Sequence, residues 1–403
     1  MNDNYNVYFL INGFWGGGAE RVIELIAEKI KAKGYQVTIV LTDQTKKAAQ
    51  SAKYYNNKLA FISLVDSLHK LSCIDILKKS VLFFTSYLGI KLYKITKFNF
   101  FGKAYICSFA LHNYEKILAL RKELYPNATI VAFQDKSIQI ALLMPHRKIN
   151  KLIISERGNP EKHNSSPITL AFIRCLYPKA DYMVFQTSSA SDYYSDIIKK
   201  KSEIIPNPLF ENIPQPYKGE REKVVVNFCR FSPEKNLSLL INAFSIFVKN
   251  FPEYTLKIYG NKNSTEAIDI IETLRGQISL LALEEKVELL DFRIDIHEEI
   301  KKCAMFVSSS DYEGMSNSML EAMAIGLPTI CTDCPAGGAR DIIDDGINGV
   351  LVPVNDPIAM SDAMQKIASS TDFSKSLSKE SIKIREKLNA DIIVNRWENI
   401  LFK

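Results

Sequence analysis

The sequence lacks the patterns that would place it in several common classes. No apolar run reaches the 18 or so residues that a membrane-spanning helix needs. No basic and apolar leader precedes the first predicted strand, which favours a cytoplasmic location. D-x-D pairs are absent, the five histidines show no ligand spacing, and the single C-x-x-C motif, CTDC, has no partner pair. We therefore expect no bound metal, and we expect the seven cysteines to be reduced core thiols.

What is present is the composition of a globular protein that is longer than one ordinary domain. The chain has 403 residues, of which 47% are hydrophobic and 24% charged, so two domains are expected. A proline-rich polar stretch, EIIPNPLFENIPQPYKGERE, separates two similar halves. We predict a first domain over residues 1–205, a second over 206–375, and a C-terminal helix over 376–403 that packs back toward the first domain.

Both halves alternate short apolar strands with amphipathic helices. In the first half, the strand YNVYFLI, the glycine loop NGFWGGG, the helix AERVIELIAEKIKAKG and the strand YQVTIVLTD follow one another. The second half restarts at KVVVNFCRFS and ends in a long predicted helix, SIKIREKLNADIIVNRWENILF. Such alternation requires parallel sheets. The expected fold is α/β, with two Rossmann-like doubly wound domains that face each other across a cleft.

The net charge of +6 is distributed unevenly. Between Leu68 and Lys103, seven lysines stand against the single acid Asp75, and aromatic and aliphatic residues fill the gaps. Nucleic acid is not the expected partner, because arginine clusters and nucleic-acid-binding motifs are missing. Two interpretations of the segment 68–103 stay open. It is either a surface that meets anionic membrane lipids or an ordinary half-buried helix with a solvated lysine face.

The stretch SSSDYEGMSNSMLEAMAIG holds the first candidate site. The predicted strand AMFVSSS ends at the carboxyl edge of the second sheet, where open α/β folds bind ligands. Gly314 permits a tight turn, and the following helix offers its first amides to an anion. These amides belong to Met315, Ser316, Asn317 and Ser318. Glu313 and Glu321 add carboxylates, which accept hydrogen bonds from sugar and ribose hydroxyls. Because Ser318 and Glu321 also form S-x-x-E, a helix capping box is the competing interpretation.

Two cations follow the first strand of the same half, in CRFSPEKN. Arg230 presents a planar fork and Lys235 a point charge, and together they match a diphosphate. A solvated charged loop would explain either residue alone. Both lie in the sheet that also carries the helix N-terminus, so we predict a diphosphate site.

Taken in order, these motifs resemble those of retaining, metal-independent glycosyltransferases with the GT-B fold, of the family 4 or group 1 type. This family includes many bacterial polysaccharide and lipid-linked-glycan transferases. The resemblance rests on the E-x7-E motif EGMSNSMLE, the R-x4-K element in CRFSPEKN and the loop GGGAERV, and ISERGNP and TDCPAGGARDIIDDGINGVLVP add to it. It spans nearly the whole chain. It implies transfer of a hexose or N-acetylhexosamine from a nucleotide sugar, with UDP favoured, to a glycan or lipid-linked glycan acceptor, without a cofactor.

The resemblance also implies roles for the candidate residues of the second half. Arg230 and Lys235 would hold the donor diphosphate. Glu313, Gly314 and the amides behind them would contact the donor sugar or its phosphates, and Glu321 would bind the ribose. Glu313, Arg230 and Lys235 are therefore the predicted catalytic residues, and they act by positioning and charge.

Other residues complete the expected donor site. Gly17 and Gly18 would let the backbone approach the phosphates from the first domain. Arg21, one turn into the same helix, points at the cleft or is an ordinary surface arginine. Phe292 and Arg293, in LLDFR, occupy the place where members of the family hold the base, unless Phe292 packs into the core.

One motif departs from the family pattern. Many members have a histidine after a strand of the first domain, near the sugar, whereas IISERGNP offers Glu156 and Arg157. These two residues are the candidates on the acceptor side. His112 and His146 lie elsewhere in the sequence, and we interpret both as structural.

Two other functions stay open. GGGAER followed by Asp43 is superficially similar to a dinucleotide fingerprint, which would suit an NAD-dependent nucleotide-sugar epimerase or dehydrogenase. However, the third glycine and a Tyr-x-x-x-Lys pair are missing. A non-catalytic sugar-nucleotide-binding protein of the same fold is the other alternative. A lipid-linked acceptor would place the protein at the inner face of the cell membrane.

Overall fold

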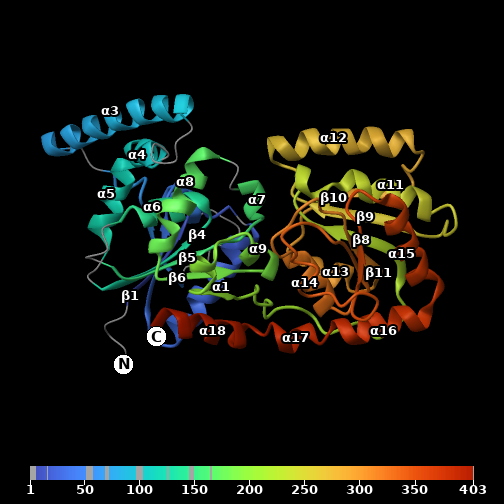
Figure 1. Cartoon of the computed structure of the whole chain (residues 1–403). Helices are drawn as coiled ribbons and strands as arrows, with labels where there is room; N and C mark the ends of the chain where they lie inside the picture. Colours follow the sequence, from blue (N-terminus) through green and yellow to red (C-terminus); the bar gives the residue numbers. More distant parts are fainter. Residues whose placement is uncertain are drawn as a thin grey trace. The chain divides into compact units, whose positions relative to one another are not determined.

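The computed structural model describes residues 6–15, 17–50, 58–68, 72–96, 103–124, 127–144, 149–163 and 166–402. His146, Gly16 of the glycine loop, and residues 69–71 and 97–102 of the basic segment lie outside the described residues. The chain forms two compact units (Figure 1). The first is Met1–Pro206 together with Ile393–Lys403, and the second is Asn207–Ile392.

The first unit is built on a seven-stranded parallel sheet with the order β3-β2-β1-β4-β5-β6-β7. From β1 the chain adds β2 and β3 on one side and then β4 on the other, so the switch point of the sheet lies between β1 and β4. The strands are β1 (Asn6–Ile11), β2 (Gln36–Leu41), β3 (Ala60–Ser63), β4 (Ala128–Phe133), β5 (Ile149–Ser155), β6 (Tyr182–Phe185) and β7 (Ser202–Ile204).

Helices connect these strands. They are α1 (Gly18–Ala32), α2 (Lys46–Gln50), α3 (Cys73–Thr96), α4 (Lys103–His112), α5 (Tyr114–Glu123), α6 (Asp135–Leu142), α7 (Pro160–His163), α8 (Pro167–Cys175), η3 (Tyr177–Lys179), α9 (Ser188–Asp192) and α10 (Asp196–Lys199). The last helix of the chain, α18 (Ala390–Phe402), belongs to this unit from Ile393 on. Every residue of β4 is buried, as expected for a parallel sheet that helices cover on both faces.

The second unit repeats this plan with a six-stranded parallel sheet of order β10-β9-β8-β11-β12-β13. Its strands are β8 (Glu222–Phe228), β9 (Thr255–Gly260), β10 (Val287–Asp291), β11 (Cys303–Ser308), β12 (Thr329–Thr332) and β13 (Val350–Val352). Its helices are η4 (Pro233–Lys235), α11 (Leu237–Phe247), α12 (Thr265–Leu280), α13 (Ile296–Ile300), α14 (Asn317–Ala324), α15 (Pro357–Ser369), α16 (Thr371–Ser381) and α17 (Ile384–Lys387). Its switch point lies between β8 and β11.

Helix starts follow local signals in the sequence. Ser264 caps α12 by accepting a hydrogen bond from the amide of Ala267 at 3.1 Å. Asp356 caps α15 in the same way, and Pro357 takes the first helical position, where a missing N–H costs nothing.

The C-terminal segment is not the single long helix that its pattern predicted. The helical backbone stops at Leu388, with φ −110° and ψ 24°, and α18 starts afresh at Ala390. The side chain of Asn389 accepts a hydrogen bond from the amide of Asp391 at 2.9 Å. Asparagine favours helix starts because its side chain competes for backbone groups in this way, and the helix therefore breaks here.

No helix within the described ranges is long and apolar enough to cross a membrane.

Candidate functional site

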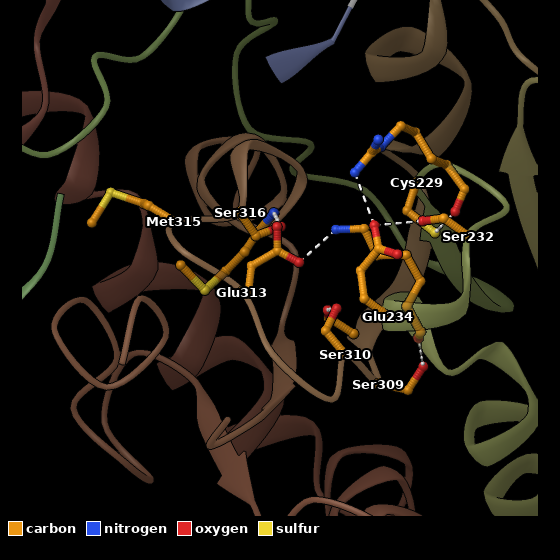
Figure 2. A network of polar contacts seen from close by, with 12 residues as sticks. Cys229, Ser232, Glu234, Ser309, Ser310, Glu313, Met315 and Ser316 are labelled. Atoms are coloured by element: carbon orange, nitrogen blue, oxygen red, sulfur yellow. Dashed lines mark hydrogen bonds and ion pairs between the residues drawn. The ribbon is translucent and has the colours of Figure 1, made fainter. Parts of the chain in front are cut away.

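The candidate site lies on the loops that leave two neighbouring strands of the second sheet. β8 and β11 pair directly, and the strand order reverses between them, so their carboxyl ends mark the position where doubly wound sheets bind ligands. The loop after β8 carries CRFSPEKN, and the loop after β11 carries SSDYEGMS. Figure 2 shows polar contacts that join residues of both loops.

The central contact of this network is the ion pair of Lys235 and Glu313. Lys235 Nζ lies 2.5 Å from Glu313 Oε2, and the lysine side chain is only 12% exposed. Burial by itself would lower the pKa of Lys235, but the Glu313 carboxylate raises it above its ordinary value. The structure thus brings together two of the predicted catalytic residues and holds the lysine in its charged form.

Arg230 extends from the same loop and is largely exposed. One guanidinium nitrogen lies 2.8 Å from Glu234 Oε1, and the Ser232 hydroxyl donates to the same oxygen at 2.6 Å. Burial would raise the pKa of Glu234, but the Ser232 hydrogen bond and the Arg230 charge hold it below its usual range. Arg230 is therefore oriented by an anchored carboxylate while its other donors face solvent.

Hydrogen bonds cross-link the two loops. Asn236 takes a left-handed conformation with φ 40° and caps α11 through its side-chain oxygen. Its amide nitrogen donates to Asp311 Oδ1 at 2.6 Å, and the Asp311 N–H donates to the Glu234 carbonyl at 2.9 Å. Ser309 donates from its hydroxyl to the Lys235 carbonyl at 2.9 Å. This bracing fixes the position of Lys235 relative to Glu313.

A third loop, after β12, supports the Glu-Gly turn. A Cβ atom on Gly338 would lie only 1.7 Å from the carbonyl oxygen of Gly314, so this position admits only glycine. The Glu313 N–H faces the Pro335 carbonyl at 3.4 Å. The motif TDCPAGGAR thus packs closely against the backbone turn at Gly314.

The start of α14 contradicts the capping-box interpretation of Glu321. Ser316 is the N-cap and accepts a hydrogen bond from the Met319 amide at 3.4 Å. Asn317 and Ser318 therefore open the first turn and Met315 and Ser316 precede it, so the competing Ser318–Glu321 box is wrong. Asn207 holds this turn through its side-chain amide, which donates to Asn317 Oδ1 at 2.7 Å.

The carboxylate of Glu321 contacts a histidine that sequence reasoning missed. Glu321 Oε2 lies 2.8 Å from His297 Nε2, and the two side chains are 3% and 14% exposed. The histidine ring packs edge-on against Phe228. The pattern of IHEEIKKC predicted only a helix, because a contact over 24 positions leaves no periodic signal.

Phe292 and Arg293 follow β10, which β9 separates from β8. Phe292 is half-buried, so it is not the core residue of the competing interpretation. Arg293 is exposed and pairs with Asp295 at 2.8 Å and Glu299 at 3.6 Å. Their role in holding the base stays a prediction.

The glycine loop of the first unit leads directly into α1. Gly17 is the N-cap of α1 with an extended backbone, Gly18 is the first helical residue, and Arg21 is half-buried one turn later. Nothing in the backbone at Gly17 demands glycine, since a Cβ there would meet only the flexible end of Glu20. The roles expected for these residues stay predictions.

Asp43 is held by lysines rather than presented to a ribose. Its carboxylate pairs with Lys116 and, at 2.8 Å, with Lys136. Burial would raise the pKa of Asp43, but hydrogen bonds from the two lysines hold it below its ordinary value. Asp43, the carboxylate of the dinucleotide interpretation of GGGAER, is therefore already engaged by two lysines.

Glu156 and Arg157 are built into the core of the first unit. Glu156 is buried and accepts a hydrogen bond from the Tyr194 hydroxyl at 2.8 Å. The Arg157 guanidinium lies over the rings of Phe133, at 4.6 Å, and Trp397, at 5.5 Å. Burial lowers the pKa of Arg157 to about 9, although the Glu156 charge opposes this. Their role on the acceptor side stays a prediction.

No group of three or more metal-ligating side chains occurs in the part of the chain that the structure describes. Cys331 and Cys334, the CTDC cysteines, are buried and free. Burial raises the pKa of Cys334 to about 12, so it stays a thiol.

The comparisons with known proteins agree with this geometry. Residues 210–384 match the model of the family Glycosyl transferases group 1. The chain carries a glycosyl transferases group 1 domain. This matched region contains Arg230, Lys235, Glu313 and Glu321.

One curated relative matches along most of the chain. The N-acetylgalactosamine-N,N'-diacetylbacillosaminyl-diphospho-undecaprenol 4-alpha-N-acetylgalactosaminyltransferase of Campylobacter jejuni is 26% identical over 361 residues, 85% of each chain. The chain spans only 23%, 62% and 27% of the length of three other curated relatives.

Two solved structures share the fold over nearly the full length. TarM of S. aureus, in complex with Fondaparinux, alpha-GlcNAc-glycerol and UDP, is 14% identical with a TM-score of 0.74, and the match covers 99% of this chain and 100% of TarM. HepE of Anabaena, in complex with UDP and glucose, is 17% identical with a TM-score of 0.73 over 98% of this chain and 99% of HepE. The expected GT-B fold of two doubly wound α/β domains is thereby confirmed.

Proposed function

We propose that this chain transfers a hexose or N-acetylhexosamine from a UDP-sugar to a glycan or lipid-linked glycan, in the synthesis of a cell-surface polysaccharide or glycoconjugate. The observation that carries the proposal is the partly buried ion pair of Lys235 and Glu313 at the switch point, beside Arg230 and the first turn of α14. Two cations and a helix N-terminus on neighbouring loops are the groups that a diphosphate needs. The Campylobacter relative is named for transfer to an undecaprenol-linked acceptor, and TarM and HepE were crystallised with UDP.

The residues act by position and charge in this proposal. The bond between the sugar anomeric carbon and the UDP oxygen breaks, and an acceptor oxygen forms the new bond on the same face of the sugar. The acceptor proton passes to the leaving phosphate oxygen and UDP leaves, and bond formation on the same face retains the configuration. Arg230 and Lys235 balance the charge that develops on the diphosphate. No metal ion or further cofactor is needed.

Glu313 and Glu321 have separate tasks. Glu313 fixes the Lys235 ammonium and accepts hydrogen bonds from donor-sugar hydroxyls. Glu321 accepts hydrogen bonds from the ribose hydroxyls of UDP.

The first experiment is a thermal-shift panel of UDP-, GDP- and ADP-sugars with the full chain. A nucleotide sugar at 100 times its Kd should stabilise the protein by about 2.7 kcal/mol. Incubation of the ligand that binds should slowly release free sugar and UDP, and EDTA should not change the rate. A non-catalytic binding protein would bind without this release, and loss of activity in EDTA that manganese restores would contradict the metal-free mechanism.

Variants of the two cations test the site itself. Lys235→Ala and Arg230→Ala should each lower turnover by roughly 100-fold or more, because a charge partner of the transition state is lost. The matched control is Lys223→Ala, which removes an exposed lysine from its pair with Glu253 in the same unit. Wild-type turnover in Lys235→Ala would refute the site.

A further inference from the structure

α3 presents an apolar surface on the outside of the first unit. It spans Cys73–Thr96 and packs against α4, on the side away from the sheet (Figure 1). Five of its side chains form an exposed stripe, in which Leu77 is 67% and Phe84 72% exposed. The stripe consists of Ile74, Leu77, Val81, Phe84 and Leu88. Their spacing of three and four residues puts them on one face of the helix.

Several polar side chains of α3 face inward. The Asp75 carboxylate accepts a hydrogen bond from the Tyr114 hydroxyl of α5 at 3.2 Å. Lys79 pairs with Glu115, also of α5, at 2.9 Å, and Ser86 is buried. Large apolar side chains thus stand outward beside the exposed Lys78 and Lys91, while several polar side chains take inward positions. The choice between a membrane surface and an ordinary half-buried helix with a solvated lysine face is left to experiment. An apolar face left in water without a partner is costly and marks an interaction surface.

The charges around the stripe favour one kind of partner. Lys78 and Lys91 are exposed on α3, whereas its single acid, Asp75, is engaged on the inward face. A second copy of this chain would bring the same lysines against them, and like charges repel. An anionic lipid surface matches both features, because lysine side chains extend to the headgroups while apolar side chains enter the acyl region.

We propose that α3 is an interfacial membrane helix that lies flat on a bilayer containing anionic lipid. The stripe enters the boundary between headgroups and acyl chains, and Lys78 and Lys91 contact the headgroups. At 1.5 Å per residue the helix is about 36 Å long, so the five side chains of the stripe enter the lipid along much of the helix length. The proposal rests on α3 alone, and it holds whether or not the chain transfers sugar.

The test is vesicle sedimentation of the full chain with phosphatidylcholine alone and with phosphatidylcholine mixed with phosphatidylglycerol. Wild type should bind the mixed vesicles. The triple variant L77Q/F84Q/L88Q should bind them at least about tenfold more weakly, because apolar burial drives interfacial binding. The matched control is I268Q/L280Q, which replaces two exposed apolar residues of α12 in the second unit and should bind as wild type does.

A second pair of variants tests the charge. K78Q/K91Q should weaken binding to the mixed vesicles by about fivefold per lysine at low salt, and the difference should shrink as salt is added. The control K249Q/K375Q removes two exposed lysines of the second unit and should change nothing.

The outcomes separate the possible partners. No binding by wild type, or equal binding by L77Q/F84Q/L88Q and wild type, overturns the proposal. A wild-type dimer in analytical ultracentrifugation that the triple variant converts to monomer, without vesicle binding, assigns the stripe to a second copy and also overturns it. If the triple variant does not fold, Phe84→Trp replaces it. Brominated lipids should quench the added fluorescence, and the same lipids should not quench Leu280→Trp.

Discussion

At the scale of single residues, Glu321 has one partner that is observed and one that is proposed. Its carboxylate meets His297 on one side, and we propose that it binds ribose hydroxyls of the donor. Glu321→Gln keeps an acceptor but removes the charge, so UDP binding should weaken by roughly 1–3 kcal/mol. His297→Phe preserves a ring beside Phe228 and removes the partner that orients Glu321, so UDP affinity should fall, but by less than in Glu321→Gln. Calorimetric UDP binding and melting temperature should be measured together.

The melting temperature distinguishes binding from structure in these variants. Glu321→Gln should melt close to wild type, because glutamine fills the same space and keeps an acceptor for His297. His297→Phe should melt lower, because it removes this partner from the buried Glu321 carboxylate. Wild-type UDP affinity in Glu321→Gln would return Glu321 to a purely structural role.

Glu24 of α1 gives a pH dependence whose sign can be worked out. Burial, and next the charge of Glu28, raise the pKa of Glu24 to about 7, although Arg21 and Lys58 oppose them. The folded chain therefore binds more protons than the unfolded chain between about pH 4.5 and pH 7, and stability falls as pH rises through this window. Glu24→Gln should raise the melting temperature at pH 8 more than at pH 4.5. An equal change at both pH values would contradict the assignment.

The contrast between Lys235 and His297 shows what sequence could predict about the site. Arg230, Lys235 and Glu313 each follow a buried strand, and parallel strands bring such loops to one edge of a sheet. The sequence therefore predicted that these residues lie near one another, and the 2.5 Å contact of Lys235 with Glu313 agrees with this prediction. His297 lies on the short helix α13, and the direction of its side chain depends on how α13 packs beside Phe228. No local pattern encodes that packing.

At the scale of elements, the loop after β12 limits the geometry of the Glu-Gly turn. Gly338→Ala should force the Gly314 carbonyl away, at a cost of roughly 1–3 kcal/mol in stability and with loss of UDP affinity. Gly276→Ala in α12 is the matched control, since a Cβ there meets nothing within 4 Å. It should raise stability by roughly 0.5–1 kcal/mol, because alanine loses less entropy in a helix. Similar changes in both variants would contradict the close approach at Gly338.

The elements also show where sequence patterns fail. Strands such as β1 and β11 were predicted because long apolar runs must be covered on both faces. β3 and β7 were missed, since four and three residues carry no usable period and their pairing depends on the neighbouring strand. In the C-terminal segment the helical periodicity of the sequence continues across Asn389. The structure has a helix break there, where the Asn389 side chain accepts a backbone hydrogen bond.

At the scale of the whole molecule, the first unit is completed by the end of the chain. Trp397 of α18 is fully buried and stacks on Phe133 at 5.7 Å. Lys151 of β5 donates to the Ile400 carbonyl at 2.9 Å, and Arg396 pairs with Glu203 at 2.8 Å. The first sheet therefore gains part of its core only after the second unit has been synthesised.

This dependence leads to a prediction about where stability is lost. Trp397→Ala should destabilise the first unit by roughly 3–5 kcal/mol, because it leaves a large cavity beside Phe133 and uncovers Arg157. In hydrogen exchange, β4 and β5 should lose protection, while β8 and β11 keep theirs and UDP still binds the second unit. Ile392→Ala, at an exposed position of the same helix, is the control and should leave exchange unchanged. Equal loss of protection in both sheets would mean that the units unfold as one. Unchanged β4 and β5 would show that α18 is dispensable to the first core.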